Sequence, residues 1–149
     1  MAEVMPMSSK VIQCAECGRR NRVPAAAAGT PRCGSCGASL PWIADADYTN
    51  FAQVVEDSKL PVLVDLWAPW CGPCRMVSPA LEQLARNFAG RVKLVKVNVD
   101  DSPQLSRRFD AKAIPTLLVM NGSRVIARQT GAAPEAVLRR WLEQALPTA

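Results

Sequence analysis

From residue 41 onward, apolar positions repeat with the two periods that distinguish strands from helices. Four apolar runs have the length of strands, and they cover residues 61–67, 91–99, 116–120 and 124–130. The first two are nearly continuous, which is typical of strands covered on both faces. Asn121-Gly122-Ser123 separates the last two runs and predicts an antiparallel hairpin. A further short strand is expected around Trp42 and Ile43.

Between these runs, apolar residues recur at helical spacing. The pattern predicts helices over residues 48–58, 73–89, 102–109 and 134–146. Ser102 can cap the third of them, and Pro103 suits its first position. The resulting order β-α-β-α-β-α-β-β-α predicts an α/β domain in which helices cover both faces of a central mixed sheet.

Residues 8–40 follow a different pattern and offer little from which to build a core. Their sizeable apolar side chains are Val11, Ile12, Val23 and Leu40, and no aromatic residue is present. Hydrophobic burial alone does not offset the conformational entropy of so short a segment. We therefore expect three parts, namely a flexible N-terminus over residues 1–10, a small cross-linked segment over 11–40 and the α/β domain over 41–149.

Two Cys-x-x-Cys pairs provide the cross-link that this segment needs. Cys14 and Cys17 are followed, after fifteen residues, by Cys33 and Cys36, which is the spacing of a four-cysteine zinc site. Two disulfides, or one redox pair with a leftover partner, are the alternatives. The duplicated pair favours one structural Zn²⁺ in a zinc-ribbon-like segment, and no bound organic cofactor is expected.

Charge and apolar content bear on partners and location. The net charge is +5, with five basic and two acidic residues in 1–40 and thirteen basic and eleven acidic residues in the remainder. We interpret this excess as a solvated surface rather than a nucleic-acid site, since four thiolates on Zn²⁺ would add two negative charges. No apolar run approaches the ~18 residues of a membrane helix, and no signal-peptide pattern opens the chain. A cytoplasmic location without membrane contact is therefore expected.

The third Cys-x-x-Cys pair, Cys71 and Cys74, stands between a buried strand and a long helix. A thiol at a helix N-terminus meets unpaired N–H groups, which favour its thiolate. Pro73 fits the first helical turn, where its missing N–H costs nothing. The chain beyond residue 41 contains no further cysteine and no histidine to complete a metal site. This pair is thus predicted to be a redox couple, with Cys71 exposed and Cys74 deeper.

The same residues resemble a known family. The stretch "WAPWCGPC" (67–74) matches the active-site signature of the thioredoxin family, and the similarity continues through Pro79, "KVNVD" (96–100), "IPT" (114–116), "NG" (121–122) and Gly131. The resemblance spans about residues 41–147. With the four-cysteine segment in front, the chain is similar to the bacterial zinc-carrying thioredoxin 2 group.

The resemblance implies a thioredoxin fold and the reduction of protein disulfides. Electrons would arrive from NADPH through a flavin-containing thioredoxin reductase, and a monomer is expected. Cys71 would attack the substrate disulfide, and Cys74 would then release the reduced substrate. Gly72 and Pro73 match the reducing members of the family, because oxidising relatives usually carry a histidine there.

Asp65 is a lone carboxylate in an otherwise apolar strand. It is interpreted either as a buried acid satisfied by Lys96 of the next apolar strand, or as the proton acceptor of Cys74 with a pKa raised by desolvation. Sequence alone does not separate these two roles, and both can hold together. The resemblance favours the functional one.

The resemblance also implies a substrate-binding rim. Only about 5–6% of X–Pro bonds are cis, yet a cis proline is expected at Ile114-Pro115 beside the dithiol. Ile114 would pair with an extended substrate strand. The complete set expected to bind substrate is Trp70, Gly72, Pro73, Ile114, Pro115 and Gly131, with Ala132 completing the apolar rim.

Two rival functions are considered. A periplasmic oxidant or isomerase is disfavoured, since the chain lacks both a signal-peptide pattern and an active-site histidine. In the other rival, the ribbon is a binding or chaperone-type module and thiol exchange is secondary. That ribbon carries Arg19, Arg20, Arg22 and Arg32 but no aromatic residue to stack on bases, so nucleic acid is not the expected partner.

Overall fold

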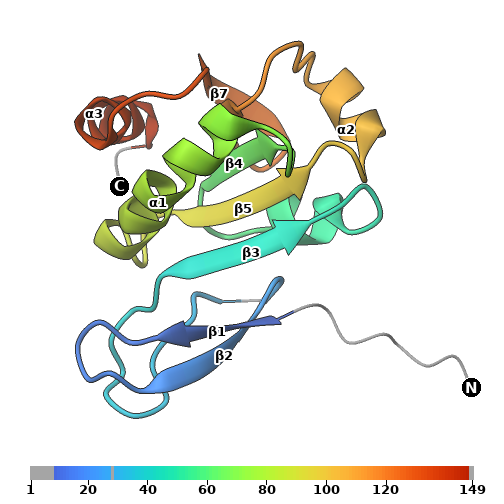
Figure 1. Cartoon of the computed structure of the whole chain (residues 1–149). Helices are drawn as coiled ribbons and strands as arrows, with labels where there is room; N and C mark the ends of the chain where they lie inside the picture. The colour runs from blue at the N-terminus through green and yellow to red at the C-terminus, as the bar shows by residue number, and fades with distance from the viewer. Residues whose placement is uncertain (1–8, 28, 148–149) are drawn as a thin grey trace, which may run out of the picture.

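The computed structural model describes residues 9–27 and 29–147 and contains two β-sheets (Figure 1). The small sheet is a hairpin of β1 (Ser9–Gln13) and β2 (Arg20–Pro24). The large sheet comprises β3 (Trp42–Ala46), β4 (Val62–Trp67), β5 (Lys93–Asn98), β6 (Thr116–Asn121) and β7 (Arg124–Thr130). The helical elements are η1 (Ala52–Glu56), α1 (Gly72–Asn87), α2 (Pro103–Arg108) and α3 (Glu135–Ala145). In the described part of the chain, no helix is long and apolar enough to cross a membrane.

The large sheet is mixed, as the order of the apolar runs predicts. Its strands lie in the order β3-β5-β4-β6-β7, with β5 parallel to both β3 and β4 and the remaining neighbours antiparallel. The central strand β4 is buried along almost its whole length, which explains its nearly continuous apolar sequence. The dithiol segment follows directly from its carboxyl end.

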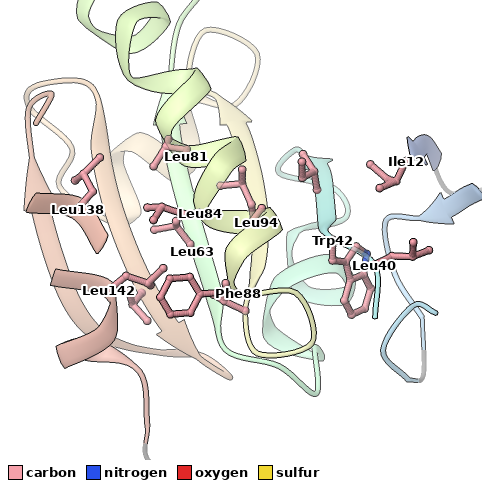
Figure 2. Close-up of a cluster of buried hydrophobic side chains, with 14 of the residues drawn as sticks. Ile12, Leu40, Trp42, Leu63, Leu81, Leu84, Phe88, Leu94, Leu138 and Leu142 are labelled. Carbon is pink, nitrogen blue, oxygen red and sulfur yellow. The ribbon is translucent and has the colours of Figure 1, made fainter. Parts of the chain in front are cut away.

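Helices cover both faces of the sheet, which confirms the predicted layers. On one face, Leu81 and Leu84 of α1 pack with Leu63 of the sheet and Leu138 of α3 (Figure 2). On the other face, the core contains side chains from η1 and α2, including Val54 and Leu105. Burial on both faces gives the α/β domain a hydrophobic core on each side of its sheet.

The four-cysteine segment lies against β3 and shares its core (Figure 1). Ile12 and Leu40 are buried in the same cluster as Trp42 (Figure 2). Val23 belongs to this cluster too. The Trp42 indole N–H donates to the carbonyl of Pro24 at 3.0 Å. Ala25 packs with the cluster on the opposite face, so the segment covers the β3 edge from both sides.

The observed elements differ from the sequence-based expectations at two places. Within the helix expected over residues 48–58, the structure has only a short π-helix, η1, and the residues before it form a turn held by hydrogen bonds between Asp47 and Asn50. The hairpin of β1 and β2 was not predicted, and it begins at Ser9 rather than residue 11. Of the N-terminus expected to be flexible, residues 1–8 lie outside the described residues.

Candidate functional site

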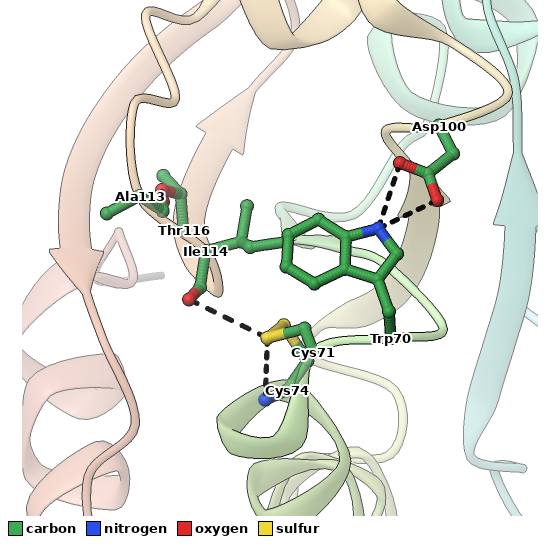
Figure 3. The surroundings of a disulfide bond; sticks show 7 residues. All are labelled: Trp70, Cys71, Cys74, Asp100, Ala113, Ile114 and Thr116. Carbon is green, nitrogen blue, oxygen red and sulfur yellow. Dashed lines mark hydrogen bonds between the residues drawn. A yellow bond between two sulfur atoms is a disulfide. The ribbon is translucent and has the colours of Figure 1, made fainter.

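The dithiol is positioned by the junction between β4 and α1. Cys71 is the N-cap of α1, with extended backbone angles of φ −85° and ψ 109°. Cys71 and Cys74 form a disulfide, and the Cys74 backbone N–H donates to Cys71 Sγ at 3.1 Å (Figure 3). A sulfur in this position receives an N–H group that has no partner within the helix. The first turn of α1 therefore stabilises a thiolate at Cys71 in the reduced protein.

The expected exposure of Cys71 is wrong for this disulfide state. Cys71 is 4% exposed and Cys74 is 2% exposed, so neither sulfur is open to solvent. The loop before β6 covers them, and Cys71 Sγ lies 3.7 Å from the carbonyl oxygen of Ile114 (Figure 3). A substrate consequently meets the rim before it reaches the sulfurs.

The rim brings together the residues expected to surround the dithiol. Trp70 is 70% exposed, and its indole N–H donates to both carboxylate oxygens of Asp100, at 3.0 and 3.2 Å (Figure 3). The Ile114-Pro115 peptide bond is cis, as expected. Gly131 has a φ of +88° and donates its N–H to Pro115 at 2.8 Å.

The remaining members of the expected rim lie at its edge. Gly72 and Pro73 are exposed in the first turn of α1, and Ala132 is exposed before α3. Among the described residues, the Ile114 amide donates no hydrogen bond and its carbonyl meets only Cys71 Sγ. The Ile114 backbone is thus available to pair with an extended chain.

Asp65 lies in β4 beneath the dithiol. It is 0% exposed, and neither carboxylate oxygen has a hydrogen-bond partner among the described residues. Asp65 and Cys74 line a common cavity of about 260 Å³. Burial raises the pKa of Asp65 from 3.8 to about 6, while the charge of Lys96 lowers this pKa by a smaller amount. A carboxylate with such a pKa can exchange a proton near neutral pH.

Lys96 is not the direct hydrogen-bond partner of Asp65 that one interpretation required. The two residues are neighbours in the β4–β5 register, but they form no ion pair within 4.0 Å in the described chain. Lys96 Nζ donates instead to Ser78 Oγ at 2.9 Å and lies 5.2 Å from the centre of the Trp67 ring. The ammonium therefore acts on Asp65 through space.

The four N-terminal cysteines converge on one point. Their sulfur atoms all lie within 4.8 Å of one another, and the closest contacts are Cys14–Cys36 at 3.6 Å and Cys17–Cys33 at 3.5 Å. Sulfurs bound tetrahedrally at about 2.3 Å from a zinc ion would be about 3.8 Å apart, whereas a disulfide needs about 2.05 Å. Backbone N–H groups of Cys36 and Ser35 lower the pKa of Cys33 to about 6. At Cys36 the backbone of Ala38 lowers the pKa, but the neighbouring cysteine sulfurs and burial raise it further, to about 12, so without a metal the cluster retains a shared proton. These residues are positioned to bind a metal ion as thiolates.

Comparison with known proteins places the chain in a family. A thioredoxin family model matches residues 42–144. Thioredoxin of Haemophilus influenzae is 48% identical over 102 residues, which are 68% of this chain and 92% of that protein. Thioredoxin C-3 of Corynebacterium nephridii is 40% identical over 139 residues, which are 91% of this chain and 95% of that protein. The chain belongs to the thioredoxin family.

Further relatives extend this result. Thioredoxin M4, chloroplastic, of Arabidopsis thaliana is 36% identical over 143 residues, covering 93% of this chain and 72% of that protein. The matches to thioredoxin C-3 and thioredoxin M4 are longer than the thioredoxin domain, so they include part of the four-cysteine segment. The chain is a thiol-disulfide oxidoreductase with Cys71 and Cys74 as its active-site pair.

Two residues of this thioredoxin site were missed by sequence reasoning. Ser78 follows Cys74 by four residues, so helical spacing places both on the same face of α1, and this signal was present in the sequence. Asp100 ends the "KVNVD" motif, but only the folded chain brings it to Trp70. Trp67, the last residue of β4, is half-buried and lines the Asp65 cavity.

Proposed function

We propose that this thioredoxin is a cytoplasmic protein-disulfide reductase of the zinc-carrying thioredoxin 2 kind. The observation that carries the proposal is the N-capping dithiol above a buried Asp65 whose carboxylate has no hydrogen-bond partner in the described part of the chain. The exposed Trp70 and the free Ile114 backbone support a protein substrate, because together they offer an apolar contact and a site for an extended chain.

The first half of the reaction is the attack on a substrate. The Cys71 thiolate attacks one sulfur of a substrate disulfide, so a mixed disulfide forms and the other substrate sulfur leaves as a thiolate. That thiolate takes a proton from solvent. The helix N-terminus makes Cys71 the attacking residue, because the Cys74 N–H stabilises the Cys71 sulfur as an anion.

The second half is resolution of the mixed disulfide. Asp65 takes the proton of the Cys74 thiol, and the Cys74 thiolate attacks Cys71 Sγ. The Cys71–Cys74 disulfide forms, and the second substrate sulfur leaves and is protonated. Two electrons have then passed from the dithiol to the substrate. Asp65 and Cys74 line the same cavity, which supports this role for Asp65. A carboxylate and a thiol enclosed together can exchange a proton directly or through a water molecule.

Zn²⁺ is the metal that we propose for Cys14, Cys17, Cys33 and Cys36, the four residues whose sulfurs meet. Four cysteine thiolates form a closed tetrahedral site that leaves no position for a reacting molecule. When bound, the ion would cross-link the segment and take no part in electron transfer. The reducing cytoplasm would keep these four thiols available as ligands.

We also propose that electrons reach Cys71–Cys74 from NADPH through thioredoxin reductase. The test is reduction of insulin disulfides driven by NADPH and that flavoprotein, with zinc counted on the same sample. Wild type should turn over with one zinc per chain. Well under one zinc in the reduced protein would contradict the metal assignment, and no turnover with either NADPH or dithiothreitol would contradict the reductase assignment.

Serine variants of the dithiol test the assigned roles. Cys71→Ser should lose all measurable reductase activity, because no other described thiol lies at the rim. Cys74→Ser should accumulate a mixed disulfide with a model substrate, since it can attack but cannot release. Mass spectrometry of the adduct measures this outcome. A Cys74→Ser protein without adducts, at full metal content, would show that Cys71 is not the attacking thiol.

A further inference from the structure

Lys96 lies between two carboxylates, one exposed and one buried. In the sheet, Asp45 of β3, Lys96 of β5 and Asp65 of β4 are neighbours in register. Neighbouring residues of parallel strands point to the same side of the sheet. Asp45 is largely exposed, whereas Asp65 is completely buried. The Lys96 ammonium therefore has two anionic positions available on the same face.

Two cavities meet at Lys96. One is the Asp65 cavity of about 260 Å³, and the other has about 330 Å³ and is lined by Asp45, Asp47 and Asp101 as well as Lys96. The second cavity is strongly acidic. Coulomb attraction alone would draw a free ammonium toward these three carboxylates and away from Asp65.

Ser78 is the hydrogen-bond partner that holds Lys96 on the dithiol side. Lys96 Nζ donates to Ser78 Oγ at 2.9 Å, and among the described residues it makes no ion pair with Asp45, Asp47 or Asp101. Ser78 lines the Asp65 cavity and projects from α1 one turn after Cys74. The Ser78 hydroxyl oxygen accepts a hydrogen bond from the Lys96 ammonium and leaves its positive charge intact.

We propose that Ser78 is a positioning residue that keeps the Lys96 ammonium in the Asp65 cavity against the attraction of the neighbouring acidic cavity. The proposal deepens the proposed reductase mechanism and rests on Asp65 acting as the proton acceptor. Among the described residues, the Ser78 hydroxyl is hydrogen-bonded to Lys96 and to neither active-site sulfur, so its effect is expected to pass through Lys96.

The charges around Asp65 set the direction of the effect. From α1, Arg75 and Cys74 line its cavity, and from β5 the ammonium of Lys96 does so. Its register neighbour in β6 is the apolar Leu117. Burial raises the pKa of Asp65, and Lys96 partly opposes this rise. Loss of the Ser78 hydroxyl would move Lys96 away and remove that opposition.

On the other side of Lys96, two acidic groups already have partners. Asp45 pairs with Lys10 of β1 at 3.1 Å, and Asp47 accepts hydrogen bonds from Thr49 and from the Asn50 amide. The surface pair of Asp45 is screened by water and does not prevent a second cation from approaching. A released Lys96 would therefore still be attracted to this cavity.

The first experiment measures the Asp65 pKa directly by carboxyl NMR titration of oxidised protein, in which neither active-site thiol titrates. Ser78→Ala should raise the Asp65 pKa by about 0.5–1 pH unit, the size expected when a cation retreats by several ångströms. Ser78→Thr should restore the wild-type value. Ser106→Ala, which removes a half-buried serine hydroxyl from α2, is the matched control and should leave the pKa unchanged.

A double variant tests whether Ser78 acts through Lys96. Lys96→Met should itself raise the Asp65 pKa, and Ser78→Ala in that background should add no further shift. An unchanged or lowered pKa in Ser78→Ala, or an added shift in the double variant, would overturn the proposal. Circular dichroism verifies that each variant is folded, and alanine is compatible with the helix.

Kinetics separate this proposal from the assignment of Asp65. In Ser78→Ala, the pH midpoint of mixed-disulfide resolution should rise by the same amount as the Asp65 pKa. If the pKa rises while the midpoint stays constant, Ser78 positions Lys96 but Asp65 is not the proton acceptor, so the clause linking Ser78 to resolution is overturned. If neither moves, Ser78 has no positioning role, whatever Asp65 does.

Discussion

The chain uses the same Cys-x-x-Cys spacing in two regions with opposite outcomes. In the four-cysteine segment, two alike turns over residues 14–18 and 33–37 face each other, and each closes with a glycine amide bonded to the first cysteine carbonyl, Gly18 at 2.9 Å and Gly37 at 3.0 Å. Four sulfurs converge there without a disulfide. At the start of α1, a single pair spans one helical turn and forms a disulfide.

The difference lies in what surrounds each pair. The dithiol is held by a domain with a packed core on each face of its sheet. The four-cysteine segment contributes only a few buried side chains, and these join a core built mainly by the other region. On the proposed metal assignment, an ion would organise the sulfurs in the first region, whereas the fold organises the sulfurs in the second. The spacing alone does not decide the chemistry.

Replacement of one proposed metal ligand should have the largest effect of the changes considered. It should disrupt the four-cysteine segment and leave the dithiol region intact. Cys14→Ser should lose bound zinc and the hydrogen-exchange protection of residues 9–27, because the segment has little core of its own. Insulin reduction should persist, since the dithiol contacts none of the four cysteines. Metal analysis and hydrogen exchange measure the first effects, and the insulin assay measures the second.

The matched control for this variant is Ser35→Ala, which changes an exposed residue within the same turn and removes no ligand. It should keep its zinc and its protection from exchange. A Cys14→Ser protein that retained full metal content would show that the four sulfurs are not a joint site. One that lost all reductase activity while remaining folded would show that the two regions are functionally inseparable.

Sequence patterns predicted best what depends on local spacing. The four cysteines and the N-capping dithiol were found because each requires only residues close together in the chain. Continuous apolar runs predicted strands buried on both faces, and the order of strands and helices predicted the mixed sheet. Burial of Cys71 was missed, because the loop that covers it lies 43 positions away and its position depends on the completed sheet.

Contacts between the four-cysteine segment and the α/β domain could not be predicted from the sequence either. Lys93 begins an apolar strand, and a lysine at a strand end is normally solvated. In the structure, it reaches carbonyls that lie 68 and 39 positions away. The pairing of Lys96 with Ser78 rather than Asp65 was missed for a similar reason. The strand register makes Lys96 and Asp65 neighbours, but the hydrogen-bond acceptor of Lys96 is Ser78 of α1.

Asp65→Asn tests the dithiol region, and its expected effect on stability and activity is intermediate in size. The folded-state pKa of about 6 exceeds the ordinary 3.8, so the folded protein binds more protons than the unfolded chain between these values. Wild type therefore loses stability as pH rises through that window, by about 2–3 kcal/mol, and the loss is complete above pH 6. The asparagine variant should lack this loss and be more stable at pH 7, with a smaller difference at pH 4.

Activity should move in the opposite direction. Resolution of the mixed disulfide should slow in Asp65→Asn by about 100-fold or more at pH 7, since a positioned general base typically contributes about 10²- to 10⁴-fold, while initial attack by Cys71 changes little. Urea unfolding and rapid-mixing kinetics measure the two effects. Asp57→Asn, at an exposed position, is the control and should change neither. Equal resolution rates in wild type and variant from pH 6 to 9 would leave Asp65 without a catalytic role.

Lys93→Met should have the smallest effect, and it tests the contact between the two regions. Lys93 is completely buried, and its ammonium donates to Ala25 of the four-cysteine segment at 2.5 Å and to Val54 of η1 at 2.6 Å. It also lies 4.0 Å from the centre of the Trp42 ring. Methionine would remove a costly buried charge but leave two buried carbonyls unpaired, and these effects oppose each other at pH 7.

The pH dependence separates the two contributions. Burial lowers the pKa of Lys93 from 10.5 to about 8, so the unfolded chain binds more protons than the folded protein between these values. Wild type therefore gains stability as pH rises from about 8 to 10.5, and the variant lacks this gain.

The free energies of unfolding of wild type and Lys93→Met should differ by less than about 1 kcal/mol at pH 7, and wild type should be the more stable by about 1–2 kcal/mol at pH 10. Urea unfolding at both pH values measures this gap, with exposed Lys59→Met as the control. A gap that stayed constant with pH would mean that Lys93 has the same pKa in the folded and unfolded protein, and its hydrogen bonds to the two carbonyls would then fully offset the burial of its charge.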